Sequence, residues 1–418
     1  MRHNNDYICN PMNDIEIIQV NISGEDKPGL TAALTGVIAK YDADILDIGQ
    51  ANIHQSLTLG ILFKTTSEKS GFIMKDLLLA ASRLGEQIRF AAVDGPEYDS
   101  WVKRQGKDRY IITLLGRTIS AAQISEITSV ITSHSLNIDA IKRMSGRRPL
   151  SEVEAAKSKC CIELSVRGHI SEDNWLLFRK DLLNHSSSGL DISFQKDDIY
   201  RRSRRLVCFD MDSTLIGTEC IDELAARAGV GDKVKEITAS AMRGEIDFVE
   251  SFTRRVALLE GLDEAVMEDV ARNLPYNEGL ERLMRTLKMV GYKTAILSGG
   301  FTYFARQLQQ KFGFDYIYAN ELEIVDGKLT GRYVGDVVDG RRKAELLKLL
   351  CQFEGINLAQ AVAVGDGAND LPMISLSGLG IAYHAKPKVK ANAGQTLSTI
   401  GLDGRLYFLG LKDTQIDA

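Results

Sequence analysis

Strand-like and helix-like hydrophobic patterns alternate along the first two hundred residues. In the first round, "IEIIQVNI" is typical of a strand, and apolar residues then recur at helical spacing from Leu30 to Ile38. "DILDIGQANIH" and "LTLGILFKT" predict two more strands, a second amphipathic helix follows near 72–84, and "QIRFAAV" predicts the last strand. The predicted order is strand, helix, strand, strand, helix, strand.

The same order returns from Arg109 onward. "RYIITLLG" predicts a strand, Ile124, Ile127 and Ile131 mark a helix, and "LNIDAIKRM" and "CCIELSVRG" predict two strands. A helix around 173–184 and the strand "LDISFQK" complete the round. This repetition indicates an internal duplication, with two α+β, ferredoxin-like modules that each cover one sheet face with two helices.

After Arg205 the pattern becomes α/β. Five apolar runs, "RLVCFDM", "KTAILSGG", "DYIYANEL", "AVAVGDG" and "GLGIAYH", predict strands, and "GKLTGRYVG" predicts a hairpin arm. Helices are predicted over 301–312 and 342–353, and the stretch from Cys220 to about Leu287 is mostly helical. Strands that alternate with helices predict a Rossmann-like parallel sheet with helices on both faces.

These patterns divide the 418 residues into four parts. We predict an N-terminal tail over 1–13, a first module over 14–100, a second over 101–200 and an α/β domain over 201–418. Within the α/β domain, the helical stretch at about 217–275 is typical of a cap inserted beside a catalytic sheet.

Composition and charge narrow the class of protein. The chain is 44% hydrophobic and 26% charged with a net charge of -5, which is typical of a globular protein and favours neither nucleic acid nor membrane as a partner. The arginines at 201–205 are interpreted as a solvated linker. Six cysteines without metal or disulfide spacing, a polar N-terminus and no membrane-length apolar window predict a cytoplasmic protein.

Polar chemistry follows three of the predicted strands. Asp210 and Asp212 follow one strand and Asp366 and Asp370 another, and such an oxygen-rich set suits Mg²⁺. "SGG", at 298–300, is predicted to open a helix and to offer backbone N–H groups to an anion. Because sites in parallel sheets lie beyond the carboxyl ends of strands, these groups are expected to meet.

Lys343, near the start of the next helix, can add a positive charge to this set. A metal site, an anion cradle and adjacent carboxylates together predict phosphoryl transfer. Each part alone has a plainer interpretation, since an acid pair can cap a strand end and a lone "SGG" is often a turn. The ordered combination after successive strands favours the catalytic interpretation.

The two N-terminal modules resemble tandem ACT-type regulatory domains. The resemblance is best at "GEDKPGL" in the first module, and it implies an amino-acid effector near Asp26, Pro28, Gly29 and Leu30. The second module has "GRTISAA" there and lacks the Pro-Gly turn. Such domains often pair edge to edge, which implies a homodimer. The alternative is that both modules serve only dimerisation or packing.

The motifs "DMDST", "SGG", Lys343 and "GDGAND" resemble the four ordered motifs of the haloacid-dehalogenase superfamily. Within it, residues 206–401 are similar to the phosphoserine phosphatases. The resemblance implies Mg²⁺-dependent hydrolysis of O-phospho-L-serine to L-serine, the last step of serine biosynthesis, through an aspartyl phosphate. It implies Asp210 as nucleophile and Asp212 as proton donor and acceptor. Mg²⁺ would be held by Asp210, the Asp212 carbonyl and Asp366, with Asp370 in support.

The resemblance also implies substrate residues. Glu219 would receive the substrate ammonium and Arg255 its carboxylate, because an acid and an arginine fork suit a zwitterion. The phosphoryl group would contact Ser298, Gly299 and Lys343, with Asn369 nearby, and Met242 and Phe248 would form a lid. From spacing alone, Glu219 could instead be a first-turn helix acid, Arg255 a solvated arginine, and the lid pair core residues.

Two other functions fit the same residues. One is a phosphatase or phosphotransferase that acts on another small phosphomonoester. The other, from a different class, is an amino-acid-sensing regulatory protein whose phosphatase half is vestigial. Turnover of phosphoserine with and without Mg²⁺ separates these from the leading hypothesis.

Overall fold

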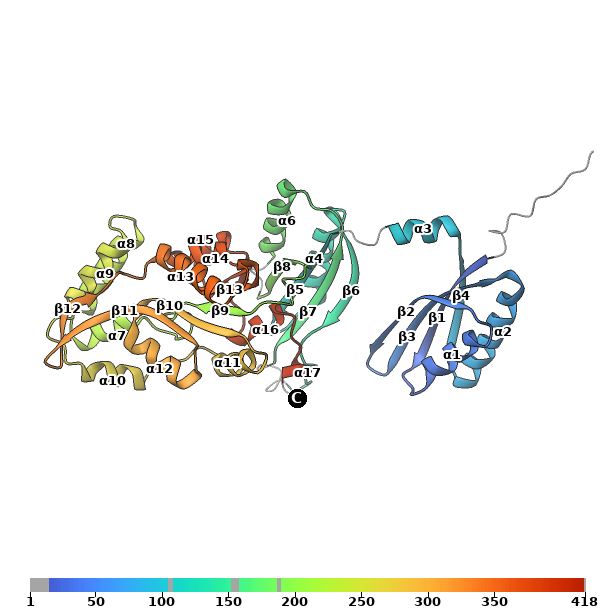
Figure 1. The fold of residues 1–418 in the computed structure, drawn as a ribbon, viewed down its shortest axis with the longest axis horizontal. Coiled ribbons are helices and arrows are strands. Elements are labelled where there is room, and N and C mark those ends of the chain that lie inside the picture. Colours follow the sequence, from blue (N-terminus) through green and yellow to red (C-terminus); the bar gives the residue numbers. More distant parts are fainter. Residues whose placement is uncertain (1–14, 104–107, 152–157, 186–188, 417–418) are drawn as a thin grey trace, which may run out of the picture. The chain divides into compact units, whose positions relative to one another are not determined.

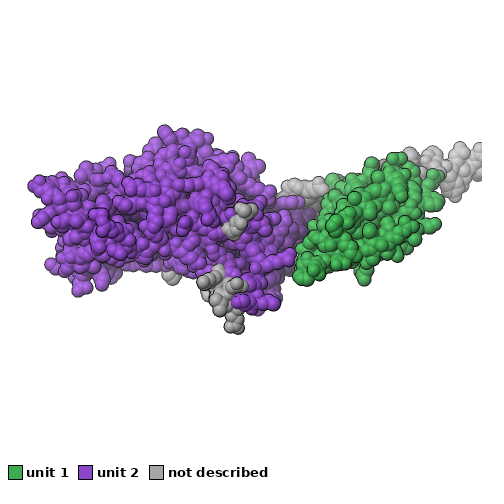
Figure 2. Space-filling model, turned by 90° about the horizontal axis from the view of Figure 1, so that it is seen from below, with its two compact units in different colours: residues 1–107 green, residues 108–418 purple. Residues whose placement is uncertain are grey.

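The computed structural model describes residues 15–103, 108–151, 158–185 and 189–416, so the tail predicted over 1–13 lies outside the described residues. The chain divides into two compact units, residues 1–107 and 108–418, which Figure 2 draws in green and purple. The division into four parts stays a prediction, because these units do not separate the second module from the α/β domain. In the parts of the chain that the structure describes, no helix is long and apolar enough to cross a membrane.

The first unit has the predicted strand and helix order, followed by one further helix over 95–103 that was not predicted. Its four strands form an antiparallel sheet in the order β2-β3-β1-β4 (Figure 1). Ile18, Val20 and Ile22 of β1 are buried in one core with residues of α1 and α2. Because side chains alternate along a strand, Gln19 points to the opposite face. The elements are β1 (Ile15–Glu25), α1 (Leu30–Ala39), β2 (Asp44–Ile53), β3 (Ser56–Thr66), α2 (Ser67–Leu84), β4 (Gln87–Val93) and α3 (Gly95–Lys103).

The second module repeats this topology inside the larger unit, with sheet order β6-β7-β5-β8. Tyr110, Ile112 and Leu114 of β5 pack in a core with α4 and α6, whereas Leu115 belongs to the core of the α/β domain. Both faces of this sheet are therefore covered. The elements are β5 (Arg109–Gly116), α4 (Ala121–Ser133), β6 (Asn137–Arg143), β7 (Cys160–Arg167), α6 (Glu172–Asn184) and β8 (Asp191–Lys196).

Polar contacts join this module to the α/β domain. The Gln395 side-chain amide accepts from the backbone N–H of Phe194 in β8 and donates to its carbonyl, each at 2.7 Å. The solvated linker predicted over 201–205 is wrong for Arg201 and Arg204, which are 1% and 4% exposed. Arg201 pairs with Glu163, because a buried guanidinium needs a counterion.

The α/β domain forms a seven-stranded sheet in the order β12-β11-β10-β9-β13-β14-β15. Strands β11, β10, β9, β13, β14 and β15 pair in parallel, and β12 pairs antiparallel with β11, which confirms the predicted parallel sheet and hairpin arm. The strands are β9 (Leu206–Phe209), β10 (Lys293–Phe301), β11 (Tyr316–Val325), β12 (Lys328–Val334), β13 (Ala361–Gly365), β14 (Leu379–Tyr383) and β15 (Gln395–Leu397).

Helices cover both faces of this sheet. Val207 and Phe209 of β9 pack in one core with α11 and α12, and Leu206 and Cys208 pack in another with α13 and α14. This alternation follows from the strand's two-residue period and confirms the Rossmann-like fold class. The helices after β9, apart from the cap, are α11 (Leu280–Met289), α12 (Thr302–Phe312), α13 (Gly340–Phe353), α14 (Leu371–Leu376), α15 (Pro387–Asn392), α16 (Arg405–Phe408) and α17 (Asp413–Ile416).

Four helices form the inserted cap between β9 and α11. They are α7 (Cys220–Arg227), α8 (Gly231–Met242), α9 (Phe248–Ala257) and α10 (Ala265–Arg272), all inside the stretch predicted as a cap. A bridge between Ile216 and Tyr276 joins the two ends of the insertion at its base. In Figure 1 the cap helices lie beside the β10–β12 end of the sheet.

Candidate active site

The central strand β9 places the first acid of the site. It lies between β10 and β13, and all three run in parallel, so their carboxyl ends meet at one edge. Asp210 follows β9 directly and its N–H donates to Val364 O of β13 at 2.8 Å. Asp366 follows β13, and Ser298 lies in the last part of β10. The strand ends that carry Asp210, Ser298 and Asp366 therefore lie at one edge of the sheet, as the sequence predicts.

Lys343 joins two of the acids. Its Nζ donates to Asp210 Oδ1 and to Asp370 Oδ1, each at 2.7 Å, and the lysine is fully buried. Lys343 lies in the first turn of α13, where Asp339 caps the helix by accepting from Arg342 N at 2.7 Å. Burial alone would lower the pKa of Lys343, but the carboxylates of Asp210 and Asp370 raise it above its ordinary value. The lysine is therefore held as a cation.

Asp210, Asp366 and Asp370 form a cluster with an excess of negative charge. Among the described residues, one carboxylate oxygen from each lies within 4.8 Å of the others. Burial, followed by repulsion from Asp370, raises the pKa of Asp210 well above its usual range and that of Asp366 to about 7. Three hard oxygen donors that repel one another fit a divalent cation such as Mg²⁺. Asp370, expected only to support the metal, lies as near the cluster as the other two.

Asp212 lies two residues beyond Asp210 and is also buried, at 8% exposed. Its Oδ1 accepts from Cys220 N, the first residue of α7, at 3.0 Å. Burial, followed by the nearby Glu219 carboxylate, raises the pKa of Asp212 to about 7. A carboxyl group with a pKa near neutrality can both donate and accept a proton under ordinary conditions.

The "SGG" segment lies at the end of β10 rather than at the helix start, so the prediction that it opens a helix is wrong. The strand continues to Phe301, and α12 begins at Thr302. Gly300 N donates to Ser298 Oγ at 2.9 Å, so this hydroxyl is held by the backbone of the same segment. A Cβ on Gly300 would lie 2.2 Å from Asp212 Oδ2, so glycine is required there for close approach to the acid.

The two predicted substrate-reading residues have different surroundings. Glu219 is exposed at the N-terminus of α7, and its Oε1 accepts from Ser213 Oγ at 2.7 Å instead of capping the helix. Arg255 of α9 is partly buried, and burial lowers its pKa while Glu219, Asp222 and Asp212 oppose that shift. Its neighbour Arg254 instead pairs with Glu250 at the surface. Arg255 is thus not an ordinary solvated arginine.

The remaining predicted substrate residues, Phe248, Asn369 and Met242, have different surroundings. The Phe248 ring lies against Gly299, where a Cβ would be 2.9 Å from Phe248 Cζ. Asn369 lies beside Asp370, and Gly340 of α13 packs on its backbone. Met242 is 62% exposed at the end of α8, with its sulfur 3.7 Å from Lys386 Nζ. The structure therefore brings Phe248 to the "SGG" segment, whereas the contact described for Met242 is with Lys386.

Sequence reasoning missed two residues that hold the site together. Asn320 of β11 is buried, donates to Gly299 O at 2.8 Å and accepts from Val338 N at 2.8 Å. Thr214 donates to Asp366 Oδ1 at 3.1 Å. A polar residue inside the strand-like run "DYIYANEL" was the available signal for Asn320. For Thr214, only its position in "DMDST" pointed to the site.

The predicted effector loop lies in the first unit. Gly29 precedes α1 with a φ of 90°, a conformation that favours glycine and accounts for the "KPG" turn. Asp26 accepts from Asn52 Nδ2 of β2 at 2.5 Å, and its N–H donates to Gln55 O at 2.8 Å. Pro28 is exposed, and Leu30 is buried in the helix core. The loop is therefore fastened to the β2–β3 hairpin.

Comparison with known families agrees with this division. The ACT domain family matches residues 16–91, and the haloacid dehalogenase-like hydrolase family matches residues 207–375. Among solved structures, a haloacid dehalogenase family hydrolase of Salmonella enterica is 29% identical, with a TM-score of 0.61 over 72% of this chain and 98% of that one. A probable phosphoserine phosphatase of Vibrio cholerae is 33% identical, with a TM-score of 0.56 over 73% and 87%.

Two curated relatives match nearly end to end. The phosphoserine phosphatase of Streptomyces coelicolor is 38% identical over 97% of this chain and 95% of its own. Phosphoserine phosphatase SerB2 of Mycobacterium tuberculosis is 36% identical over 96% and 95%. The acid site lies within the second family match, and both relatives cover nearly the whole chain, so the chain belongs to the phosphoserine phosphatase family of haloacid dehalogenase-like hydrolases.

Proposed function

We propose that the protein hydrolyses O-phospho-L-serine to L-serine and phosphate, as the last step of serine biosynthesis. The observation that carries the proposal is the pair of acids, Asp210 in contact with the Lys343 ammonium and Asp212 with its pKa raised to about 7. One carboxylate is equipped to attack and the other to transfer a proton.

In the first step, a carboxylate oxygen of Asp210 bonds to phosphorus and the bond from phosphorus to the serine oxygen breaks. Asp212 gives its proton to that oxygen, so serine leaves as an alcohol. In the second step, Asp212 accepts a proton from water, whose oxygen attacks the aspartyl phosphate and releases phosphate. Asp210 and Asp212 return to their starting states, which balances the cycle.

The phosphoryl oxygens would meet the Ser298 hydroxyl, the Gly299 N–H and the Lys343 ammonium. Asn320 supports this role because its side-chain amide donates to Gly299 O and so fixes the backbone that carries the Gly299 N–H. Mg²⁺, when held by Asp210, Asp366 and the Asp212 carbonyl, would supply charge neutralisation for the approach of two anions. Asp370, which shares Lys343 with Asp210, would support that arrangement.

Selection of serine would come from the cap. Glu219 offers a carboxylate to the substrate ammonium, and Arg255 offers a guanidinium to its carboxylate. Phe248, against Gly299, would close the apolar side over the reacting group. Met242, exposed at the end of α8, is the second residue proposed for this lid.

The test is release of inorganic phosphate from O-phospho-L-serine by the full chain, with Mg²⁺ and after its removal by a chelator. We expect turnover only with the metal, and trapping of one phosphoryl group on Asp210 in an acid-quenched reaction. Equal turnover of unrelated small phosphomonoesters would instead favour a general phosphatase. Absence of both turnover and phosphoryl trapping would favour a regulatory protein.

For the first unit we propose an amino-acid effector at Asp26, Pro28, Gly29 and Leu30, and for the chain a homodimer in the cytoplasm. Calorimetric titration of the full chain with L-serine, in the wild type and in Asp26→Ala, tests the effector site. Heat of binding that is equal in the two proteins would exclude Asp26. Light scattering should give the mass of two chains if the dimer exists.

A further inference from the structure

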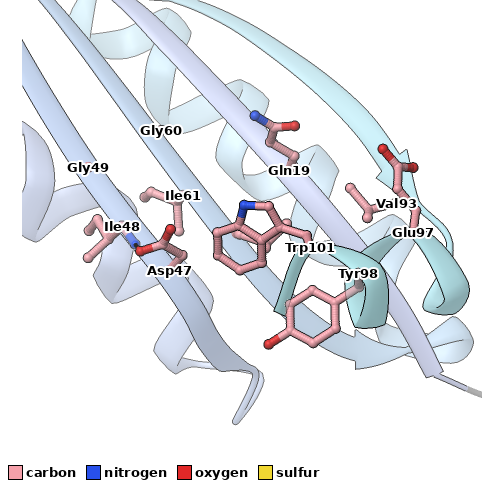
Figure 3. A pocket seen from close by; sticks show the side chains of 11 residues that line it. Gln19, Asp47, Ile48, Gly49, Gly60, Ile61, Val93, Glu97, Tyr98 and Trp101 are labelled. Carbon is pink, nitrogen blue, oxygen red and sulfur yellow. Dashed lines mark hydrogen bonds between the residues drawn. The ribbon is translucent and has the colours of Figure 1, made fainter. Parts of the chain in front are cut away.

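A hollow in the first unit takes no part in the proposed phosphatase chemistry. It is a cavity of about 290 Å³ on the face of the sheet opposite α1 and α2, and α3 borders it (Figure 3). Its lining includes Gln19 of β1, Asp47 and Gly49 of β2, Gly60 of β3, and Tyr98 and Trp101 of α3. The effector loop proposed above is a different feature, because it connects β1 to α1, and α1 lies on the other face of the sheet.

Two glycines form the floor of the hollow. Gly49 and Gly60 are direct partners across β2 and β3. A Cβ on Gly49 would meet nothing within 4 Å, and a Cβ on Gly60 would meet only Asn21 Oδ1 at 3.7 Å and a backbone oxygen at 3.9 Å. Neither packing nor a left-handed backbone requires glycine here. Paired glycines inside strands weaken a sheet, and they are typical of places where a ligand approaches the backbone.

Two aromatic side chains form the opposite wall. Tyr98 and Trp101 come from successive turns of α3, and their ring centroids are 5.9 Å apart. Figure 3 shows the Trp101 indole above the strands and the Tyr98 ring beside it, with its hydroxyl pointing outward. Such rings offer apolar contact area and a negative face that attracts cations.

The charge of the lining is one-sided. Asp47 Oδ1 accepts from Ile48 N at 2.9 Å, and its other oxygen has no partner among the residues that the structure describes. Asp47 and Trp101 line the same hollow, as Figure 3 shows. Glu97 adds a second carboxylate, and the described lining contains neither lysine nor arginine. An anionic ligand would therefore meet like charge without a counterion.

In the second module, the corresponding face of the sheet is covered by other parts of the chain. There, Leu115 and Cys161 pack in the core of the α/β domain together with Leu406 and Tyr407. The first module has the same strand order, but exposed or partly exposed Gln19, Gly49 and Gly60 replace that packing. Among the residues that the structure describes, the first copy therefore has a recess on the face that the second copy packs against the α/β domain.

We propose that this hollow binds a small organic cation, a primary ammonium carried on a flat apolar body. The ammonium pairs with Asp47 beside the face of Trp101. The body lies on the bare backbone of Gly49 and Gly60, against the two aromatic rings. A carboxylate next to an aromatic face is the chemistry that recognises ammonium groups in other binding sites.

The experiment uses the full chain with Trp175→Phe, which leaves Trp101 as the one tryptophan of the two in the sequence. Three probes that differ in their head group, 2-phenylethylamine, 2-phenylethanol and 3-phenylpropanoate, are titrated while Trp101 fluorescence is recorded. We expect saturable binding of the amine, about tenfold tighter than that of the alcohol, and no binding of the anion. In Asp47→Asn, the amine should lose most of this advantage over the alcohol.

Gly49→Val tests the floor, because the new side chain fills the hollow without a clash and favours the strand. We expect loss of the amine response, whereas Ala51→Val, on the same strand and face but outside the lining, should keep it. Circular dichroism establishes that both variants fold. Amine binding no tighter than that of the alcohol, unchanged affinity in Asp47→Asn, or a full response in Gly49→Val would each overturn the proposal.

Discussion

The ammonium of Lys343 lies 2.7 Å from Asp210 Oδ1, with the two side chains 0% and 8% exposed. Burial raises the pKa of Asp210, and Lys343 opposes that rise. The proposed nucleophile therefore lies against a buried cation that favours its charged form. Asp370 shares the same ammonium at 2.7 Å, so one lysine balances two acids.

Lys343→Met should lower kcat on phosphoserine by about 100-fold or more, because a preorganised charge at the phosphoryl group is lost. It should also lower the free energy of unfolding by about 3 kcal/mol in the absence of metal. Lys348→Met, at an exposed position on the same helix, is the control. Chemical denaturation and steady-state kinetics measure the two effects.

The stability loss in Lys343→Met should depend on pH. Without the lysine, the folded-state pKa of Asp210 rises further above its unfolded value, so the folded protein binds a proton that the unfolded chain releases. Stability is then retained in acid and lost as pH rises through the folded-state pKa. A deficit as large in mildly acidic as in mildly alkaline solution would contradict this account.

Asp212→Asn should slow turnover by about 10²- to 10⁴-fold, because the amide can neither give nor take the proton. The fold should be retained, since the asparagine oxygen can still accept from Cys220 N. Asp232→Asn, at an exposed position in the cap, should leave kcat unchanged. Rapid-quench kinetics with calorimetry of Mg²⁺ binding measure both properties, and near-normal turnover would remove Asp212 from the mechanism.

Arg255→Ala should raise KM for phosphoserine by about 10- to 100-fold, because a charged hydrogen bond to the substrate carboxylate is lost. An aryl phosphate without a carboxylate should be affected much less. Arg254→Ala, which removes a surface arginine paired with Glu250, is the matched control. Similar losses on both substrates would mean that Arg255 supports the cap rather than reads the carboxylate.

Gly300→Ala should reduce kcat more strongly than Gly299→Ala. The first Cβ would lie 2.2 Å from Asp212 Oδ2 and would displace the proton-transfer group. The second would lie 2.9 Å from Phe248 Cζ, the end of a side chain that can move aside. Kinetics of the two variants, with thermal unfolding as the check on folding, test this order. Equal kcat values would show that the close approach of Gly300 to Asp212 is not needed.

The division of the chain predicts how fragments behave. A fragment of residues 15–103 should fold, because its core is complete within the first unit. A fragment of residues 1–200 should expose the face of the second sheet around Leu115 and Cys161 and bind a hydrophobic dye strongly. Dye binding as weak as that of the shorter fragment would show that residues 101–200 form a self-sufficient domain.

Periodicity along the chain determined the two repeated modules, the parallel sheet and the helical cap, because strand and helix periods are local properties of the chain. The order of acids after strands likewise pointed to Asp210, Asp212, Asp366 and Lys343. Local pattern could not show that Asn320 fixes Gly299, because their contact crosses from one strand to the next.

Tertiary packing alone decided which polar residues are buried. Arg201 and Arg204 looked solvated in a run of arginines, yet they lie between the second module and the α/β domain. Within the second unit, packing against the α/β domain covers one face of the second module's sheet, whereas the corresponding face within the first unit carries the hollow above Gly49. Both modules have the same local period, so the period alone did not show that the second sheet packs against the α/β domain through Leu115 and Cys161.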